Sequence, residues 1–351
     1  MMALCGLGGV GQAGGLTWRL AASEPVATGA MLDLIPAFDW QKVVVDPWTV
    51  DLPLYGWMML MAFLVTTACG LIGNYLLLRR LALVGDAISH SVLPGLVAGF
   101  LIFGSLGIGP MLVGAVLAGV LTTVLIELIH SHSRVKADAA IGITFCSLFA
   151  LGVLLINVYA GQVHLDAECV LYGELSHVPW AEQVTVLGVG MPLSVVVMGV
   201  ATGIVALLTG LFYKELLISS FDAGLAAAFG FRPRVIHYTL MAMLSLVVVA
   251  AFESVGAILV IAMLILPGAT AQLLSTRLPV CFGLSVAHAA LSSVLGVHLG
   301  LWLGCSLAAA VVVAGTGLFG VAWGFSLFWG RAREGREGLV KLGLEGVGDG
   351  N

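Results

Sequence analysis

An aspartate and a histidine stand four residues apart in the segment GDAISHS, residues 85–91. Residues four apart lie on one face of a helix, so we expect Asp86 and His90 to be stacked about 5 to 6 Å apart. A carboxylate together with an imidazole suits a borderline divalent cation such as manganese, iron or zinc. The spacing therefore indicates a candidate metal-binding pair.

Pro94 follows this pair by one helical turn. Proline has no N–H group, so it would leave the carbonyl of His90 without its helical donor and free to face a cavity. In the alternative interpretation, Asp86 lies near the membrane surface, caps the helix and pairs with Arg79 or Arg80, while His90 bonds a neighbour. Residue types alone leave both interpretations open.

Glu253 is another charge between two strongly apolar runs. It either lies at the outer end of a span or turns inward where the backbone breaks, and Gly256, Pro267 and Gly268 permit such a break. Spacing alone favours neither. An inward carboxylate would be a further candidate cation ligand.

Other polar residues carry weaker signals. Glu127 and His130 have the E-x-x-H spacing of metal–carboxylate bundles, but matching glutamates on partner helices are absent, which favours a solvated helix end. His288 and His298 share one apolar run and are interpreted as helix-packing histidines rather than residues that line a path. The acidic loop 161–182 is interpreted as a solvated loop, although it could also meet an incoming cation or a partner protein.

The elements that position these residues are membrane spans. Of the 351 residues, 60% are apolar and 9% charged, against roughly 45–50% and 25% in soluble domains. A span needs about 20 apolar residues, and we predict about nine of them, with eight to ten allowed. They lie at 57–78, 87–107, 110–130, 139–160, 184–212, 235–252, 255–275, 280–298 and 300–329. The predicted fold is thus an all-α polytopic membrane protein.

Basic residues give the orientation, because Lys and Arg remain on the cytoplasmic side of short loops. Alternate connections carry them, whereas loop 161–182 has none. Nine spans then place the N-terminus outside and the C-terminus in the cytoplasm. Residues 1–54 form an N-terminal extension that is extracytoplasmic or interfacial, 55–330 form the transmembrane domain, and 331–351 form a cytoplasmic tail.

The cytoplasmic segment 213–234 resembles a contact site for a soluble partner. Ser220 or Asp222 could cap a short amphipathic helix that ends at Gly230. The sequence contains no G-x-x-x-x-G-K-[ST] motif, so any ATP-driven work requires another subunit.

Three ordered motifs resemble one known family. They are GNYLLLRRLALVGDAISHSVLPGL at 73–96, SSFDAGLAAAFGF at 219–231 and FESVGAILVIAMLILPGATAQLL at 252–274. They are similar to the signature, coupling and late-span regions of the permease subunits of bacterial manganese, zinc and iron ABC importers. The resemblance covers roughly residues 55–330.

The resemblance implies an ABC importer permease bundle with a cytoplasmic coupling helix, located in the bacterial cell (inner) membrane. It implies a dimer of permease chains, a cytoplasmic ATP-binding subunit and an extracytoplasmic metal-binding protein. Asp86 and His90 then match positions that bind the transported ion, and Glu253 falls where manganese-type members of the family place a further acidic ligand. Manganese is the favoured cargo, zinc and iron are alternatives, and no permanently bound cofactor is implied.

The same resemblance makes residues 213–234 the coupling segment, which contacts the ATPase. The contact is formed by Asp222 and its neighbours Ser220, Phe221, Ala223 and Gly224. The family has Asp-Pro where this chain has Asp222 followed by Ala223.

Two rival classes use the same residues differently. A proton-coupled secondary metal transporter would keep the ligand pair, but it would need a titrating relay and no coupling helix. An intramembrane hydrolase would need a nucleophile with a base partner or an H-E-x-x-H motif, and the sequence shows neither.

Overall fold

The computed structural model describes residues 36–79, 81–104, 108–159, 175–186 and 188–345, with the backbone alone at 82, 108, 110–112, 186, 189, 253, 257–258 and 329–345. The chain divides into two units, Met1–Ala37 and Phe38–Asn351. Every element described below belongs to the second unit.

Long apolar helices dominate the described residues, and eight of these segments are long enough to cross a bilayer. They are α2 (Leu52–Leu78), the consecutive helices α3 (Ala82–Ser91) and α4 (Leu93–Phe103), α5 (Ile108–His132), α6 (Ala137–Tyr159), α8 (Leu193–Leu211), α11 (Pro233–Val255), α13 (Leu278–Leu303) and α14 (Leu307–Glu345). A further apolar helix, α12 (Ala257–Leu274), has 18 residues, which gives about 27 Å at 1.5 Å per residue. The predicted all-α polytopic fold is confirmed.

Shorter elements lie between these helices or before them. They are η1 (Gln41–Val45), α1 (Asp46–Thr49), η2 (Leu175–Trp180), β1 (Gln183–Val186), β2 (Val189–Pro192), α9 (Tyr213–Phe221) and α10 (Ala223–Ala228).

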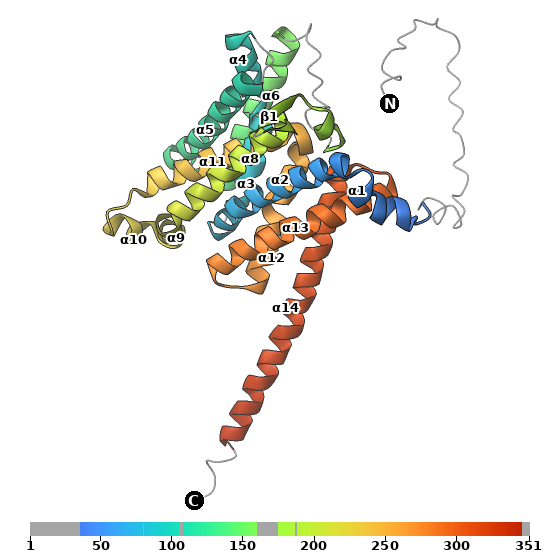
Figure 1. Ribbon diagram of the computed structural model, residues 1–351. Helices are drawn as coiled ribbons and strands as arrows, with labels where there is room; N and C mark the ends of the chain where they lie inside the picture. Colours follow the sequence, from blue (N-terminus) through green and yellow to red (C-terminus); the bar gives the residue numbers. More distant parts are fainter. Residues whose placement is uncertain (1–35, 80, 105–107, 160–174, 187, 346–351) are drawn as a thin grey trace, which may run out of the picture. The chain divides into compact units, whose positions relative to one another are not determined.

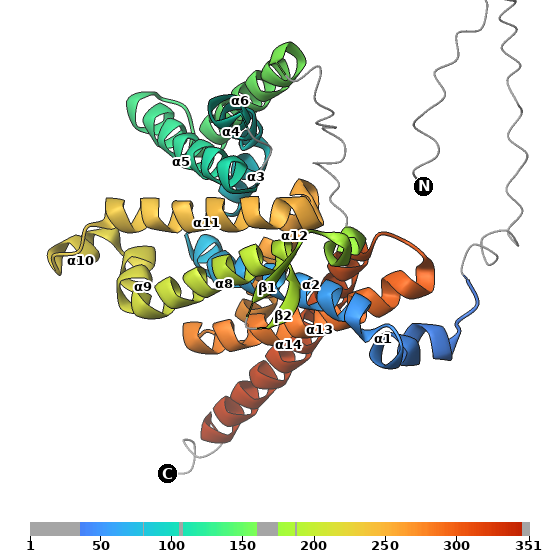
Figure 2. The ribbon, with the colours of Figure 1, turned by 45° about the horizontal axis from the view of Figure 1, so that its top comes forward.

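Helix α11 lies between two groups of helices (Figures 1 and 2). Helices α3, α4, α5 and α6 pack against one another on one side, and α11 contacts α3 and α5 of this group. Helices α2, α12, α13 and α14 form the other group, and α11 contacts α2 and α12 there. Helix α8 packs against both α2 and α11, so it forms a further connection between the second group and α11.

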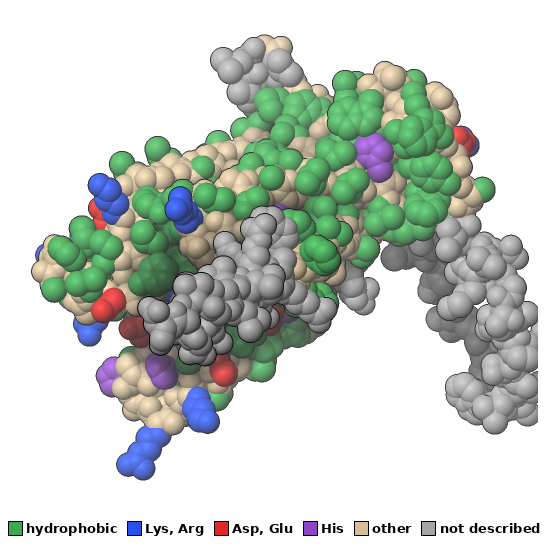
Figure 3. Space-filling view, turned by 90° about the horizontal axis from the view of Figure 1, so that it is seen from below, with side chains coloured by type: hydrophobic (Ala, Val, Ile, Leu, Met, Phe, Trp, Pro, Cys, Tyr) green, Lys and Arg blue, Asp and Glu red, His purple; other side chains and the backbone are tan. Residues whose placement is uncertain are grey.

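The outer faces of the spans are apolar. Leu117 on α5 and Leu154 and Val158 on α6 are 56–65% exposed. Figure 3 shows broad hydrophobic areas interrupted by few charged side chains. Exposing so large an apolar surface to water is unfavourable, whereas the apolar chains of lipids can cover it.

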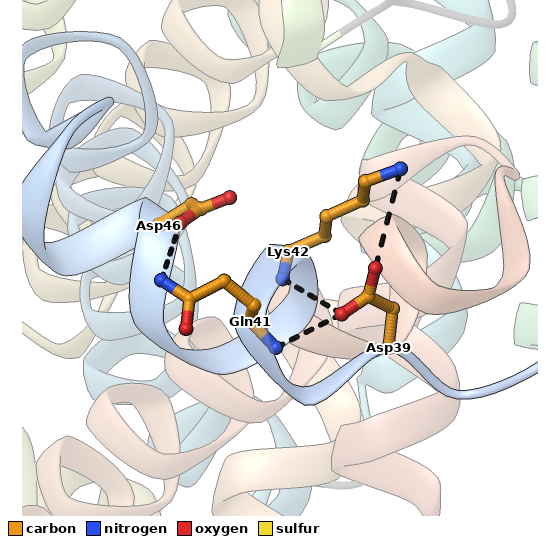
Figure 4. Close-up of polar contacts among 4 residues, drawn as sticks. All are labelled: Asp39, Gln41, Lys42 and Asp46. Carbon is orange, nitrogen blue, oxygen red and sulfur yellow. Dashed lines mark hydrogen bonds and ion pairs between the residues drawn. The ribbon is translucent and has the colours of Figure 1, made fainter.

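A polar turn precedes the first span (Figure 4). Asp39 Oδ1 accepts hydrogen bonds from the backbone N–H groups of Gln41 at 3.1 Å and Lys42 at 3.5 Å. The amide of Gln41 donates to Asp46 Oδ1 at 3.1 Å, and the Lys42 ammonium lies 4.0 Å from Asp39 Oδ2. The two bonds that Asp39 accepts satisfy backbone N–H groups in the first turn of η1, which lack helical acceptors.

The second predicted span is divided into α3 and α4 at Val92, which keeps α-helical dihedral angles (φ −67°, ψ −26°), so the apolar segment Leu83–Phe103 continues through this local interruption. The carbonyl of Val92 accepts hydrogen bonds from the N–H groups of both Gly95 and Leu96, and Pro94 stands in the first turn of α4. Proline fits the first turn of a helix because its missing N–H would have had no partner there. The interruption therefore lies directly after the candidate metal pair.

A break separates α11 from α12 at Gly256, which has φ +80° and ψ 155°. Only glycine adopts this backbone region readily. Of the residues that permit a break, Gly256 makes one, whereas Pro267 stays inside α12.

The predicted span at 184–212 is wrong in its first part. Strands β1 and β2 pair antiparallel, with Val186 opposite Val189, and Gly188 has φ +83° in the turn. Glycine adopts a positive φ in a tight hairpin turn at no steric cost. Pro192 then ends the hairpin, and α8 starts at Leu193.

The last two predicted spans also have different boundaries. Helix α13 continues to Leu303 and ends at Gly304, whose φ of +63° gives a left-handed C-cap. Helix α14 begins at Leu307 rather than at 300 and remains helical to Glu345, through most of the predicted tail.

The core is centred on α2, which contacts α8, α11, α12 and α13. A Cβ atom at Gly73 would overlap the backbone carbonyl oxygen of Leu264, so glycine permits the close crossing of α2 and α12. The fully buried amide of Asn74 donates to the carbonyl of Gly70 at 2.7 Å and to Ser285 Oγ on α13 at 2.8 Å. Small residues and interhelical hydrogen bonds are the usual means of holding membrane helices together.

Candidate functional site

Asp86 and His90 face each other on α3. The distance between Asp86 Oδ1 and His90 Nε2 is 3.3 Å, and the two side chains are 41% and 22% exposed. The helical spacing thus brings one oxygen and one nitrogen donor together, as predicted. Both donors retain access to space outside the packed core, which a transported ion would need.

Aromatic rings from α6 hold the imidazole in place. The ring centroids of Phe145 and Phe149 lie 5.4 and 6.0 Å from that of His90. The residue after His90, Ser91, shares a 2.7 Å hydrogen bond with Thr122 on α5. These contacts fix α3 between two neighbouring helices and leave the Nε2 edge of His90 directed at Asp86.

The capping interpretation of Asp86 is wrong. The N-cap position of α3 is Leu81, so Asp86 lies in the body of the helix. The guanidinium of Arg79 donates to Ser219 and Ser220 on α9 instead of pairing with Asp86. Arg80 lies outside the described residues.

Glu253 lies in the last turn of α11, just before the break at Gly256, but its side chain lies outside the described residues. Residues 160–174, the larger part of the acidic loop, lie outside them as well. Within the part of the chain that the structure describes, no cluster of three or more His, Cys, Asp or Glu side chains could hold a metal. Among the described residues, Asp86 and His90 therefore supply two donors to a candidate metal site.

The coupling segment forms two short helices at one end of α8 and α11 (Figures 1 and 2). Asp222 caps α10, because its Oδ1 accepts the N–H groups of Gly224 at 2.8 Å and Leu225 at 3.0 Å. Helix α10 ends at Ala228, and Gly230 follows with φ +85°. The predicted cap at Asp222 and the glycine that follows the helix are confirmed.

The coupling segment exposes large apolar side chains where the spans end. Phe221 is 71% exposed, Leu225 49% and Phe229 66%. Such a group of side chains, next to the polar residues Ser220 and Asp222, is typical of a surface that a protein partner covers.

Arg79 connects the coupling segment to α2, which the sequence did not reveal. Its Nη2 donates to Ser219 Oγ at 2.6 Å and its Nε donates to Ser220 Oγ at 3.0 Å. Burial lowers the pKa of the Arg79 guanidinium, while the nearby Tyr75 raises it. Arginine stays charged after such a shift, so both hydrogen bonds are charge-assisted.

The other polar residues that were considered in the sequence analysis contact neighbouring side chains or backbone groups of the protein. Glu127 Oε2 lies 3.7 Å from His237 Nε2 on α11, whereas His130 Nδ1 lies 3.3 Å from the carbonyl of Val135. His237 was not identified from the sequence as the partner of Glu127, because the two residues lie on separate helices and no sequence spacing connects them.

His298 lies on α13. Its Nδ1 donates to the carbonyl of Val294, and its Nε2 accepts from the indole N–H of Trp48. These bonds support the helix-packing interpretation.

His288 on α13 is buried, with 4% exposure. A Cβ atom at Gly315 of α14 would lie 3.2 Å from His288 Nε2, so the imidazole fills the space between the two helices. This placement also supports helix packing.

Comparisons with known proteins agree with the arrangement of helices. The model of the ABC 3 transport family matches residues 52–326. The manganese transport system membrane protein MntD of Bacillus subtilis is 47% identical over 262 residues, which are 73% of this chain and 86% of that protein. The zinc transport system membrane protein TroD of Treponema pallidum is 42% identical over 268 residues, or 76% of this chain and 73% of that protein.

A solved structure is also similar. The structure described as PsaBC from Streptococcus pneumoniae in complex with Fab matches with a TM-score of 0.68 and 33% identity, and the match covers 81% of this chain and 95% of the other.

Proposed function

The chain belongs to the ABC 3 transport family, and we propose from this premise that it is the membrane permease of an ABC importer for divalent transition-metal ions. Manganese is the favoured cargo, because the similar proteins include a manganese transport system membrane protein at 47% identity. Zinc is the next candidate, since a similar protein at 42% identity belongs to a zinc transport system. The metal is cargo, and no resident cofactor is proposed.

The observation that carries the site is the 3.3 Å approach of Asp86 Oδ1 to His90 Nε2 on a span that is locally interrupted two residues later. Asp86 would neutralise part of the ion's charge, and neutral His90 would replace a water ligand with an imidazole nitrogen. Two protein donors leave other coordination positions to water or to Glu253. An incomplete shell of this kind suits transport, because the ion must leave as well as bind.

The coupling segment is proposed as the docking site of a separate ATP-binding subunit. Its exposed apolar residues Phe221, Leu225 and Phe229 support this, and so do the basic residues Lys214 and Arg232 nearby, which favour a cytoplasmic position. With this end in the cytoplasm, and with α12 counted as a ninth crossing beside the eight longer segments, the N-terminus lies outside and the C-terminus inside. An extracytoplasmic metal-binding protein would deliver the ion, and a second permease chain would complete the pathway.

Transport would follow alternating access. Closure of the ATPase subunits would move α9 and α10, and the hydrogen bonds of Arg79 to Ser219 and Ser220 would pass that movement to α2. Helix α3 begins three residues after Arg79, so the ligand pair is close to this connection. The proton-coupled alternative has no comparable use for a capped coupling helix.

The test is uptake of radiolabelled manganese in cells that express the permease with its ATPase and its binding protein. We expect Asp86→Ala and His90→Ala each to abolish most uptake at equal membrane expression, with the ATPase still copurifying. His130→Ala, a histidine at the end of α5, is the matched control and should transport normally. Normal uptake by both ligand variants would contradict the proposed site.

A further inference from the structure

A cavity of about 280 Å³ opens between α8, α9 and α11, apart from the metal pair and from the exposed face of α10. Leu208 and Phe212 line it from the end of α8, Leu216 from α9, and Ile236 and Met243 from α11. The walls are therefore apolar, as a binding site for a hydrocarbon chain requires.

The cavity is deep along the spans. Its lining runs from Arg232, just before α11, to Met243, the eleventh residue of that helix. At 1.5 Å per residue this distance is about 16 Å. Leu207 and Leu211 on α8, each directly before a lining residue, are 67% and 68% exposed, so this end of α8 also has an apolar face that lipid would cover.

Two opposite charges line the same cavity. Glu215 Oε2 is buried and has no hydrogen-bond partner among the described residues. Arg232 is exposed, and no ion pair joins it to Glu215 in the described part of the chain. A buried carboxylate oxygen without a donor is costly, so a donor from outside the chain would stabilise it.

We infer that this cavity binds a phospholipid of the cytoplasmic leaflet whose headgroup carries a primary ammonium, an ethanolamine phospholipid. The ammonium would donate to Glu215 Oε2, the phosphate would face Arg232, and one acyl chain would lie along Ile236 towards Met243. A zwitterion satisfies both charges at once, whereas a glycerol headgroup offers no cation and a choline headgroup offers no N–H donor.

A side chain of the ATPase is the competing occupant. A lysine or arginine from a soluble partner would satisfy Glu215, but it would leave Arg232 without an anion and the apolar depth to Met243 empty. The length and apolar lining of the cavity therefore favour the lipid.

Native mass spectrometry of the full permease, purified with its ATPase and delipidated, tests the inference. The probes are ethanolamine, choline and glycerol phospholipids with identical acyl chains, together with free phosphoethanolamine. We expect one ethanolamine lipid per permease chain, retained about tenfold better than either other lipid, and no binding of free phosphoethanolamine.

Glu215→Gln should reduce retention of the ethanolamine lipid to the choline level. Glu127→Gln is the matched control, because it removes a partly exposed carboxylate on α5, outside the cavity, and it should retain the lipid. Arg232→Gln, a change in an exposed loop residue, should weaken binding even if Glu215→Gln disturbs folding.

Equal retention of the three lipids by the wild-type protein would overturn the inference. So would undiminished binding by both cavity variants, or carbodiimide cross-linking of Glu215 to the ATPase in place of a lipid adduct.

Discussion

Arg79, the residue after α2, donates a 2.6 Å hydrogen bond to Ser219 on α9, 140 residues further along the chain. Its Nε group donates to the neighbouring Ser220. The Arg79 guanidinium thus links α2, which precedes the Asp86–His90 pair, to α9, which precedes the Asp222 cap.

We expect Arg79→Gln to lower metal uptake by about tenfold, because charge-assisted hydrogen bonds contribute about 1.5–3 kcal/mol. ATPase binding should persist, while stimulation of ATP hydrolysis by cargo should fall. Uptake and ATP hydrolysis measured in the same proteoliposomes would separate these effects. Arg277→Gln, at an exposed arginine before α13, is the control, and equal loss in both variants would count against a specific connection.

Replacing Gly73 by alanine should destabilise the protein by about 1–3 kcal/mol or more, because the new methyl group would overlap the carbonyl of Leu264. Gly203 on α8 has open space around it, so Gly203→Ala should be tolerated. Thermal unfolding of both variants in detergent would measure the difference. Equal stability would show that α2 and α12 separate easily.

Asp222→Ala should weaken α10 by about 1 kcal/mol, because two N–H groups lose their acceptor. If α10 docks the ATPase, copurification of that subunit should fall about fivefold. Asp222→Asn keeps a capping oxygen and should retain most binding. Equal losses in the two variants would instead indicate that the negative charge of Asp222 is what the ATPase recognises.

His90→Asp should change the preference between metals. The change replaces an imidazole by an oxygen donor, which suits manganese better than zinc. We expect the ratio of manganese to zinc uptake to rise several-fold when both ions compete. His132→Asp, at the end of α5, should leave the ratio unchanged, and an unaltered ratio in His90→Asp would place His90 outside the coordination shell.

Sequence reasoning succeeded where the information is local. Asp86 and His90 share one helix face, and Asp222 caps the helix that follows it. Each of these relationships depends on a few neighbouring residues, so spacing and residue type suffice to predict them.

Contacts between distant segments could not be predicted in this way. The pairing of Glu127 with His237 depends on how α5 crosses α11. The β hairpin was missed because Gln183–Val186 alternates for only four residues and merges into a long apolar run. Whether Glu253 joins Asp86 and His90 remains a prediction, since it too depends on tertiary placement.

The hydrogen bond between Asn74 and Ser285 can form only after most of the chain has been synthesised. These residues are 211 positions apart, and synthesis adds about 5–20 residues per second, so α2 waits about 10–40 seconds for its partner. During that interval the Asn74 amide can use the Gly70 carbonyl of its own helix. The first span to be made is therefore among the last to be fully packed.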